Sequence, residues 1–339
     1  MKILWVTNSI YPYRQSALDY LSSAHQLTVV TLGQREVAGG VTKGMKTRSQ
    51  FFRFNIPVKQ IFQIREFDLI ITGGWDSIGY ISLITICKKL RLPCAMLYES
   101  TLDSSRFKKG IVHRIRCWTM QSATLIVALS ELSKKAAENY IGPSRKILKI
   151  NNWFDQSNFP FQANVISKEG HTFLFVGRLI PLKGLDRLFR AFTNVASAED
   201  RLHIVGEGPS LEILQKEFGD SRIEYFGRSD WSTLSAHYQK ADTLVFPSLN
   251  DVYGFPCLEA LASGLRVIVS ENSGIWADIE KLEGVFTFET LDELEKIMLL
   301  TQASPKIKIF RDLSHFSSIK IIRDIEEIKL LAEDLLQGH

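Results

Sequence analysis

Short apolar runs alternate with longer amphipathic stretches along most of the chain, a pattern typical of strands alternating with helices. The first five runs are KILWVTN, QLTVVTL, FDLIITG, PCAMLYE and TLIVALS, which begin at Lys2, Gln26, Phe67, Pro93 and Thr124. The periodicity lapses over 151–170, and a second alternating series begins at His171. Buried strands joined by helices form parallel, doubly wound sheets. The pattern therefore predicts an α/β chain with two such sheets.

The second series contains a strand, a polar turn and a helix within FPSLNDVYGFPCLEALASG, residues 246–264. The predicted strand is Thr243–Phe246, and the predicted helix Phe255–Ala262 ends before Gly264, a residue favoured just beyond helix C-termini. The next predicted strand is Arg266–Ser270. Strand, loop and helix in this order place the loop at the carboxyl edge of a parallel sheet, where open α/β folds bind ligands.

Two carboxylates flank this turn, Asp251 on the loop and Glu259 on the helix, so both can reach one ligand. Alternatively, Asp251 caps the turn and Glu259 complements the dipole at the helix N-terminus. A second strand-to-helix connection, FLFVGRLIPLKG at 173–184, contributes Arg178 and Lys183. A guanidinium and an ammonium together neutralise a diphosphate, although an isolated pair is more often surface charge on a solvated loop. Their place at the carboxyl edge favours the diphosphate interpretation.

With these motifs the chain resembles the retaining nucleotide-sugar glycosyltransferases of family 4. The resemblance rests on VGRLIPLKGLDRL at 176–188, LHIVGEGPSLEIL at 202–214, residues 223–270, and ATLIVALSELSKKAAENYIGPSRKILKINNWFDQSNF at 123–159. It implies the GT-B fold, in which two Rossmann-like domains face an interdomain cleft. The expected parts are an acceptor-side domain at 1–160, a nucleotide-sugar-binding domain at 161–312, and a C-terminal helix at 313–339 that returns to the first domain.

The resemblance also implies roles for individual residues. Arg178 and Lys183 would hold the donor diphosphate, Glu259 would accept hydrogen bonds from the ribose hydroxyls, and Asp251 would face the transferred sugar. The family usually has glutamate where this chain has Asp251, so the reach toward the sugar is one methylene shorter. The other implied donor contacts are Gly206, Gly208, Gly227, Arg228, Tyr253, Gly254 and Phe255.

Such a site must stabilise negative charge that grows on a departing nucleoside diphosphate, and Arg178 and Lys183 suit that task. In the family the anomeric configuration is retained by attack on the face of the leaving group, so neither a nucleophilic carboxylate nor a metal is expected. Seven scattered histidines and four cysteines without zinc-site spacing agree with this expectation. We expect no cofactor, with the nucleotide-sugar acting as co-substrate.

The acceptor-side candidates follow three strands of the first domain. They are Ser9, Tyr13, Arg14, Gly74, Glu99 and Ser100. Arg14 could bind an anionic acceptor or a donor phosphate, and the alternative is a packed Tyr13 with Arg14 capping a carbonyl. Glu99 is the candidate for orienting the acceptor hydroxyl or the sugar, and we add it to the catalytic set of Asp251, Arg178 and Lys183. Gly74 either admits a ligand closely or permits a turn.

Composition bears on compartment and partners. The 339 residues are 45% hydrophobic, which suffices for two cores, and the net charge of +4 is modest. Four cysteines and no signal peptide before Lys2 predict a reducing cytosol. A basic amphipathic segment at 106–118 predicts either peripheral contact with an anionic membrane or a helix whose apolar stripe packs in the core. No nucleic-acid-binding module accompanies the basic residues.

We expect a cytoplasmic hexosyltransferase that moves a sugar from a nucleoside-diphosphate donor to a glycan or lipid-linked acceptor in surface polysaccharide biosynthesis. Two alternatives stay open, a catalytically weak sugar-nucleotide-binding or scaffold protein and a GT-B sugar-nucleotide epimerase. A nicotinamide-dependent oxidoreductase is disfavoured because the first strand is followed by TNSIYPYR, without the glycine-rich fingerprint of dinucleotide binding.

Overall fold

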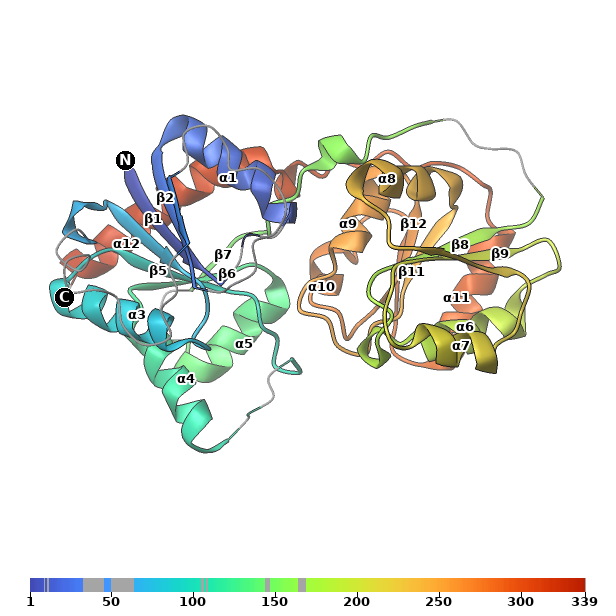
Figure 1. Ribbon diagram of the computed structural model, residues 1–339, viewed down its shortest axis with the longest axis horizontal. Coiled ribbons are helices and arrows are strands. Elements are labelled where there is room, and N and C mark those ends of the chain that lie inside the picture. Colours follow the sequence, from blue (N-terminus) through green and yellow to red (C-terminus); the bar gives the residue numbers. More distant parts are fainter. Residues whose placement is uncertain are drawn as a thin grey trace. The chain divides into compact units, whose positions relative to one another are not determined.

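The computed structural model of the chain describes residues 1–8, 10, 12–32, 46–49, 64–104, 107, 109–143, 147–163 and 169–338. The chain forms two compact units (Figure 1). Unit 1 comprises Met1–Asp155 and His315–His339, and unit 2 comprises Gln156–Ser314. Each unit contains one parallel sheet with helices on both faces, which confirms the predicted α/β class with two doubly wound sheets.

The described part of unit 1 forms a seven-stranded sheet in the order β3-β2-β1-β4-β5-β6-β7. Its strands are β1 (Lys2–Thr7), β2 (Gln26–Thr31), β3 (Lys46–Ser49), β4 (Leu69–Thr72), β5 (Cys94–Tyr98), β6 (Leu125–Ala128) and β7 (Ile147–Lys149). Its helices are α1 (Pro12–Ala24), α3 (Ile78–Leu90), α4 (Gly110–Ser122), α5 (Glu131–Ile141) and α12 (Ile321–Gln337). Every pairing is parallel, with Ile3 of β1 opposite Leu27 of β2 and Leu69 of β4.

Alternate residues of the strands in unit 1 pack into two hydrophobic cores, one on each face of the sheet. Ile3 and Trp5 of β1 pack on one face with α1 and α12, and Leu4 and Val6 pack on the other face with α3, α4 and α5. Because side chains alternate along a strand, one apolar run serves both layers. Trp153 anchors α12 by donating a hydrogen bond from Nε1 to Oδ2 of Asp324 over 2.9 Å.

Unit 2 has a six-stranded sheet in the order β10-β9-β8-β11-β12-β13. Its strands are β8 (Thr172–Val176), β9 (Arg201–Val205), β10 (Ile223–Gly227), β11 (Thr243–Phe246), β12 (Arg266–Ser270) and β13 (Val285–Phe288). Its helices are α6 (Leu185–Val195), α7 (Leu211–Glu217), α8 (Trp231–Lys240), α9 (Phe255–Ala262), α10 (Trp276–Ile279) and α11 (Leu291–Ala303). The bounds of β11, α9 and β12 coincide with those predicted from the sequence.

Helix starts in both units use side-chain caps. Ser130 and Ser133 form a reciprocal capping box at the start of α5, and Thr290 and Glu293 do so at the start of α11. Asp230 caps α8 by accepting a hydrogen bond from the backbone N–H of Thr233. These contacts satisfy backbone donors that a helix N-terminus otherwise leaves unpaired.

The strand order reverses at one point in each sheet. In unit 1, β1 lies between β2 and β4, and in unit 2, β8 lies between β9 and β11. Consecutive connections leave such a central strand in opposite directions, which opens a crevice at the carboxyl ends of the strands. The loops after β8 and β11 therefore border the crevice of unit 2, and those after β1 and β4 border the crevice of unit 1. We call these two places the switch points.

No helix in the described ranges is both long and apolar enough to cross a membrane. All four cysteines are free thiols, and Cys87, Cys94 and Cys257 are buried.

Candidate functional site

Two loops at the switch point of unit 2 are locked together. The backbone N–H of Leu249, in the loop after β11, donates to the carbonyl of Leu182, in the loop after β8, over 2.9 Å. Gly184 has a φ of 62°, and a side chain there would overlap the carbonyl oxygen of Pro247. Only glycine permits this approach, so the two motifs found in the sequence form one structure.

Lys183 and Asp251, two of the predicted site residues, meet across these loops. The Lys183 ammonium forms an ion pair with Oδ2 of Asp251, and the two side chains are 14% and 16% exposed. The Lys183 Nζ atom also lies 5.3 Å from the centroid of the Phe246 ring at the end of β11. The ammonium thus sits at the carboxyl edge of the sheet, partly screened from water.

A third loop, which follows β12, holds the backbone of Asp251. The Asp251 N–H donates to the carbonyl of Asn272 over 3.2 Å, and the Gly274 N–H donates to the Asp251 carbonyl over 2.9 Å. A side chain at Gly274 would overlap the carbonyl of Val252. Sequence reasoning missed this loop, although a glycine shortly after the predicted strand Arg266–Ser270 was an available signal.

Glu259 is buried on α9 with one hydroxyl partner. Tyr238 of α8 donates its hydroxyl to Oε2 of Glu259 over 2.5 Å. Burial raises the pKa of Glu259 to about 7, and the hydrogen bond from Tyr238 opposes that rise. Burial, followed by the neighbouring Glu259 charge, raises the pKa of Tyr238 well above its usual range. Tyr238 is a residue that sequence reasoning did not identify.

Glycines let the ends of β8, β9 and β10 approach one another. Gly206 has a φ of 140° and stands where a side chain would overlap the Gly177 carbonyl, while its own N–H donates to Gly227 over 2.7 Å. Gly208 makes the same close approach to the carbonyl of Leu179. These glycines therefore face neighbouring backbone, which explains why small residues occur here independently of any ligand.

The remaining donor-side candidates differ in exposure. Arg178 is exposed, and Arg228 is 82% exposed with Glu207 3.8 Å from its guanidinium. Gly254 has a φ of 120°, and a Cβ there would lie 3.0 Å from Ile275. The rings of Tyr253 and Phe255 lie 4.9 Å apart between centroids. The site thus combines an exposed Arg178 with a partly enclosed Lys183.

The switch point of unit 1 brings Arg14 and Glu99 together. Arg14, on α1, forms an ion pair with Oε1 of Glu99, which directly follows β5. The described partner of Arg14 is thus a carboxylate, which the sequence analysis did not predict. The Arg14 guanidinium lies 5.7 Å from the Tyr13 ring centroid. Ser100 is half-buried, and Ser9 lies outside the described residues.

The two glycines after β4, Gly73 and Gly74, differ in the space around them. A Cβ at Gly73 would lie 2.6 Å from the Tyr80 hydroxyl, whereas a Cβ at Gly74 would lie 3.4 Å from Oδ1 of Asp76. Gly73 is thus constrained by packing, while the predicted candidate Gly74 has room.

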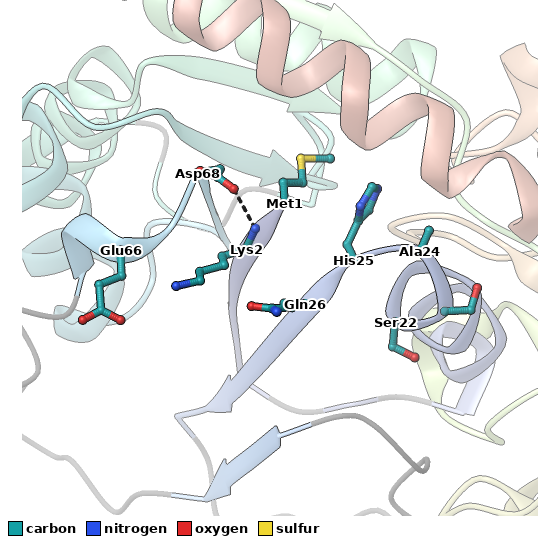
Figure 2. A pocket seen from close by; sticks show the side chains of 9 residues that line it. Met1, Lys2, Ser22, Ala24, His25, Gln26, Glu66 and Asp68 are labelled. Atoms are coloured by element: carbon teal, nitrogen blue, oxygen red, sulfur yellow. Dashed lines mark hydrogen bonds between the residues drawn. The ribbon is translucent and has the colours of Figure 1, made fainter.

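A pocket of about 520 Å³ opens at the amino ends of β1 and β2, the opposite edge of this sheet (Figure 2). None of the predicted site residues lines it.

Helix α4 exposes the apolar stripe that one alternative of the sequence analysis placed in the core. Ile111, Ile115 and Trp118 share one helix face and are 76%, 41% and 48% exposed. Arg116 instead is buried, with its guanidinium 4.2 Å from the Trp75 ring centroid and its Nη1 donating to the Tyr140 hydroxyl over 2.6 Å. The interpretation in which this stripe packs in the core is therefore wrong. Arg106 and Lys108 lie outside the described residues.

Metal binding has no candidate cluster in the described part of the chain, where no three His, Cys, Asp or Glu side chains gather as a metal site needs.

Comparison with known proteins finds one family model and several curated relatives that match part of the chain. Residues 156–296 match the sequence model of the family described as Glycosyl transferases group 1. An uncharacterised glycosyltransferase of Methanocaldococcus jannaschii is 28% identical over 188 residues, which cover 50% of this chain and 48% of that protein. The uncharacterised glycosyltransferase YqgM of Bacillus subtilis is 28% identical over 210 residues, which cover 55% and 54%. The chain thus spans about half the length of these curated relatives.

Solved structures resemble nearly the whole chain. The crystal structure of Anabaena HepE in complex with UDP has a TM-score of 0.77 at 18% identity, and the match covers 96% of this chain and 99% of that one. The same protein in complex with UDP-glucose has a TM-score of 0.72 at 18% identity, with 96% and 98% covered. The fold is therefore the GT-B fold of glycosyltransferase structures. Lys183, Asp251 and Glu259 all lie within the family match at 156–296.

Proposed function

We propose that this chain, which has the GT-B fold and carries a glycosyl transferases group 1 domain, is a retaining hexosyltransferase of family 4. It moves a sugar from a nucleoside-diphosphate donor to a glycan or lipid-linked acceptor in surface polysaccharide biosynthesis. Fold alone does not carry this proposal, since one fold hosts many chemistries. The observation that carries it is the cluster of Lys183, Asp251 and Glu259 around the switch point of unit 2.

The cluster suits the three parts of a nucleotide-sugar. Arg178 and Lys183 follow β8 and hold the diphosphate, because cations at this edge balance its charge. Glu259 accepts hydrogen bonds from the ribose hydroxyls, with Tyr238 fixing one of its oxygens. Asp251 faces the sugar. HepE was solved with UDP and with UDP-glucose, which makes UDP the first donor nucleotide to test here.

The reaction breaks the bond between the anomeric carbon and the departing phosphate oxygen. Arg178 and Lys183 stabilise the negative charge that grows on the leaving diphosphate. The acceptor oxygen attacks the same face of the sugar, and the leaving phosphate takes the acceptor's proton. The anomeric configuration is thereby retained without a protein nucleophile. Hydrogen bonds to the sugar hydroxyls hold the anomeric carbon for attack.

Unit 1 supplies the acceptor side in this proposal. Arg14 and Glu99 form an ion pair at the carboxyl ends of β1 and β5, where Glu99 orients the acceptor hydroxyl. Buried free thiols at Cys87, Cys94 and Cys257 support a reducing compartment such as the cytoplasm.

Helix α4 supports a lipid-linked acceptor at an anionic membrane surface. Ile111, Ile115 and Trp118 form an exposed apolar stripe, and the exposed cations Lys109 and Arg114 lie on the same helix start. Exposed apolar stripes flanked by cations sit in the headgroup region of anionic bilayers. We expect Ile111→Ser/Trp118→Ser to reduce co-sedimentation with anionic vesicles by about tenfold. Leu330→Ser, which alters a 65% exposed leucine on α12, is the matched control and should bind vesicles as the wild type does.

The proposed function is tested first by a thermal-shift panel of UDP, GDP, ADP, CMP and NAD. One nucleoside diphosphate should stabilise the chain by about 2.7 kcal/mol at about 100 times its dissociation constant. The sugar donors of that nucleotide are then assayed with glycan and lipid-linked acceptors, and the anomeric configuration of the product is read by nuclear magnetic resonance. Stabilisation by NAD alone, or an inverted product, would contradict the proposal. Tight nucleotide binding without transfer would indicate the scaffold alternative.

A further inference from the structure

The Lys183–Asp251 ion pair places a donor-binding cation on a carboxylate of the same site. Lys183 is expected to bind the diphosphate and Asp251 to face the sugar, yet in this structure each is the other's partner. At 14% and 16% exposure, neither side chain is well hydrated. A partly desolvated charge that loses its partner is strongly destabilised. If the Lys183 ammonium moves to a phosphate, the Asp251 carboxylate must gain another partner. Otherwise the complex is destabilised by an unpaired, partly buried charge.

Asp251 is held by more contacts than the Lys183 ammonium. Its backbone is fixed on both sides by hydrogen bonds to Asn272 and Gly274. Its Oδ1 atom accepts a hydrogen bond from the backbone N–H of Tyr253 over 3.3 Å. Lys183, by contrast, has a long side chain whose ammonium can swing about its four-carbon stem. When the two separate, Lys183 moves and Asp251 stays.

We infer that the Lys183–Asp251 ion pair is an exchange pair, opened by the donor diphosphate and re-formed to release the product nucleotide. The inference rests on the proposed function. On donor binding, the ammonium transfers from Asp251 to phosphate oxygens, and a hydroxyl of the donor sugar replaces it on the Asp251 carboxylate. After sugar transfer that hydroxyl leaves with the product. The carboxylate then recovers Lys183 and loosens the nucleoside diphosphate.

The pair should therefore weaken the binding of a nucleoside diphosphate that lacks a sugar. We expect Asp251→Asn to bind UDP, or whichever of UDP, GDP and ADP the wild type binds, about tenfold more tightly. Dissociation of that nucleotide should slow by about the same factor, since affinity changes at one site act mostly through the dissociation rate. Calorimetry gives the affinity, and stopped-flow displacement gives the rate.

A matched control removes the same charge nearby without touching the pair. Asp186 is exposed in the first turn of α6, three residues after Lys183, so Asp186→Asn should leave nucleotide affinity within about twofold of the wild type. A comparable tightening in Asp186→Asn would mean that general repulsion, and not exchange, governs binding. Such a result would overturn the inference.

A double-mutant cycle isolates the exchange itself. In a Lys183→Gln background there is no ammonium to release, so adding Asp251→Asn should change nucleotide affinity by less than about twofold. Equal tightening with and without Lys183 would overturn the inference. If Asp251→Asn fails to fold, Asp251→Ser removes the same carboxylate and carries the same expectation.

Failure of the inference is distinguishable from failure of the proposed function. A wild type that binds none of the three nucleoside diphosphates contradicts the proposed function itself. A wild type that binds one of them, together with an Asp251→Asn variant that binds it no more tightly, contradicts the exchange pair alone.

Discussion

The switch points of the two units are held together by different kinds of contact. In unit 2, backbone hydrogen bonds and close glycine contacts join the loops after β8, β11 and β12, and the ion pair of Lys183 and Asp251 lies among them. In unit 1, the Gly73 N–H donates to the Val6 carbonyl over 3.1 Å, and Tyr80 packs beside Gly73. The charged contact there is the ion pair of Arg14 with Glu99. Backbone contacts depend little on side-chain identity. Under the proposed function, the loops joined through backbone in unit 2 would bind the donor, and the ion pair of unit 1 would face the acceptor.

The largest expected effect is on stability at the glycines of the two switch points. Gly206→Ala in unit 2 should destabilise the chain by about 3 kcal/mol or more, because its φ of 140° is unfavourable for alanine and a Cβ would overlap the Gly177 carbonyl. Gly74→Ala in unit 1 should cost less than about 1 kcal/mol, because its Cβ would have an ordinary contact at 3.4 Å. Urea unfolding gives the free energy of unfolding of both variants. Equal losses of stability would contradict the expected difference between Gly206 and Gly74.

Glu259 provides a second contrast, through the pH dependence of stability. Because burial raises its pKa from 4.5 to about 7, the folded chain holds this proton more tightly than the unfolded chain. The stability that it contributes is full below about pH 4.5 and is lost as the pH rises through about 7. This loss amounts to about 3 kcal/mol. Glu259→Gln does not titrate, so its stability relative to the wild type should rise by that amount between about pH 4.5 and about pH 8.

The measurement is urea unfolding of both proteins at several pH values across that interval. Glu280→Gln is the matched control, because Glu280 is an exposed carboxylate in the same unit. Parallel pH profiles for the wild type and Glu259→Gln would show that the Glu259 carboxyl is not held in a desolvated site.

A smaller effect is expected from the ion pair of unit 1, and on a different quantity. Arg14→Gln should lower kcat/KM for the acceptor by about tenfold, because Glu99 loses the partner that orients it. Affinity for the donor nucleotide should stay within about twofold. Steady-state kinetics with varied acceptor, beside calorimetry of the nucleotide, separates the two. Loss of nucleotide affinity in this variant would assign Arg14 to the donor side.

The smallest expected effect is that of Tyr238→Phe. Without the hydroxyl that donates to Glu259, the pKa of Glu259 should rise further, because that hydrogen bond favours the carboxylate. Nucleotide affinity near neutral pH should fall by about threefold to tenfold, and its pH midpoint should move upward. Tyr80→Phe in unit 1 is the matched control. An unchanged pH profile would contradict a positioning role for Tyr238.

Local elements of the site could be predicted from the sequence because their signals are local. Apolar runs define β11 and β12, and Pro256 and Gly264 mark the ends of α9. The ion pair of Lys183 and Asp251 joins residues 68 positions apart. Nothing in the local pattern specifies that distance, so both residues could be named while their pairing could not.

Tyr238 and Gly274 were missed for a related reason, since each acts on a loop or helix other than its own. Helix α4 shows a second limit of pattern reading. Its spacing revealed an apolar stripe but not which face packs against the sheet, and stacking of Arg116 on Trp75 buries a cation while Ile111 stays exposed. The helical period alone does not tell whether the face of Ile111 or the face of Arg116 packs against the sheet.

The central claim is that the switch point of unit 2, and not that of unit 1, binds the donor nucleotide. Calorimetry with UDP, GDP and ADP on the wild type, Glu259→Gln and Arg14→Gln tests it most directly. We predict that one nucleotide binds the wild type, that Glu259→Gln weakens it by about 100-fold through the lost charged hydrogen bonds, and that Arg14→Gln changes it by less than about twofold. Weakened binding in Arg14→Gln with undiminished binding in Glu259→Gln would contradict the account.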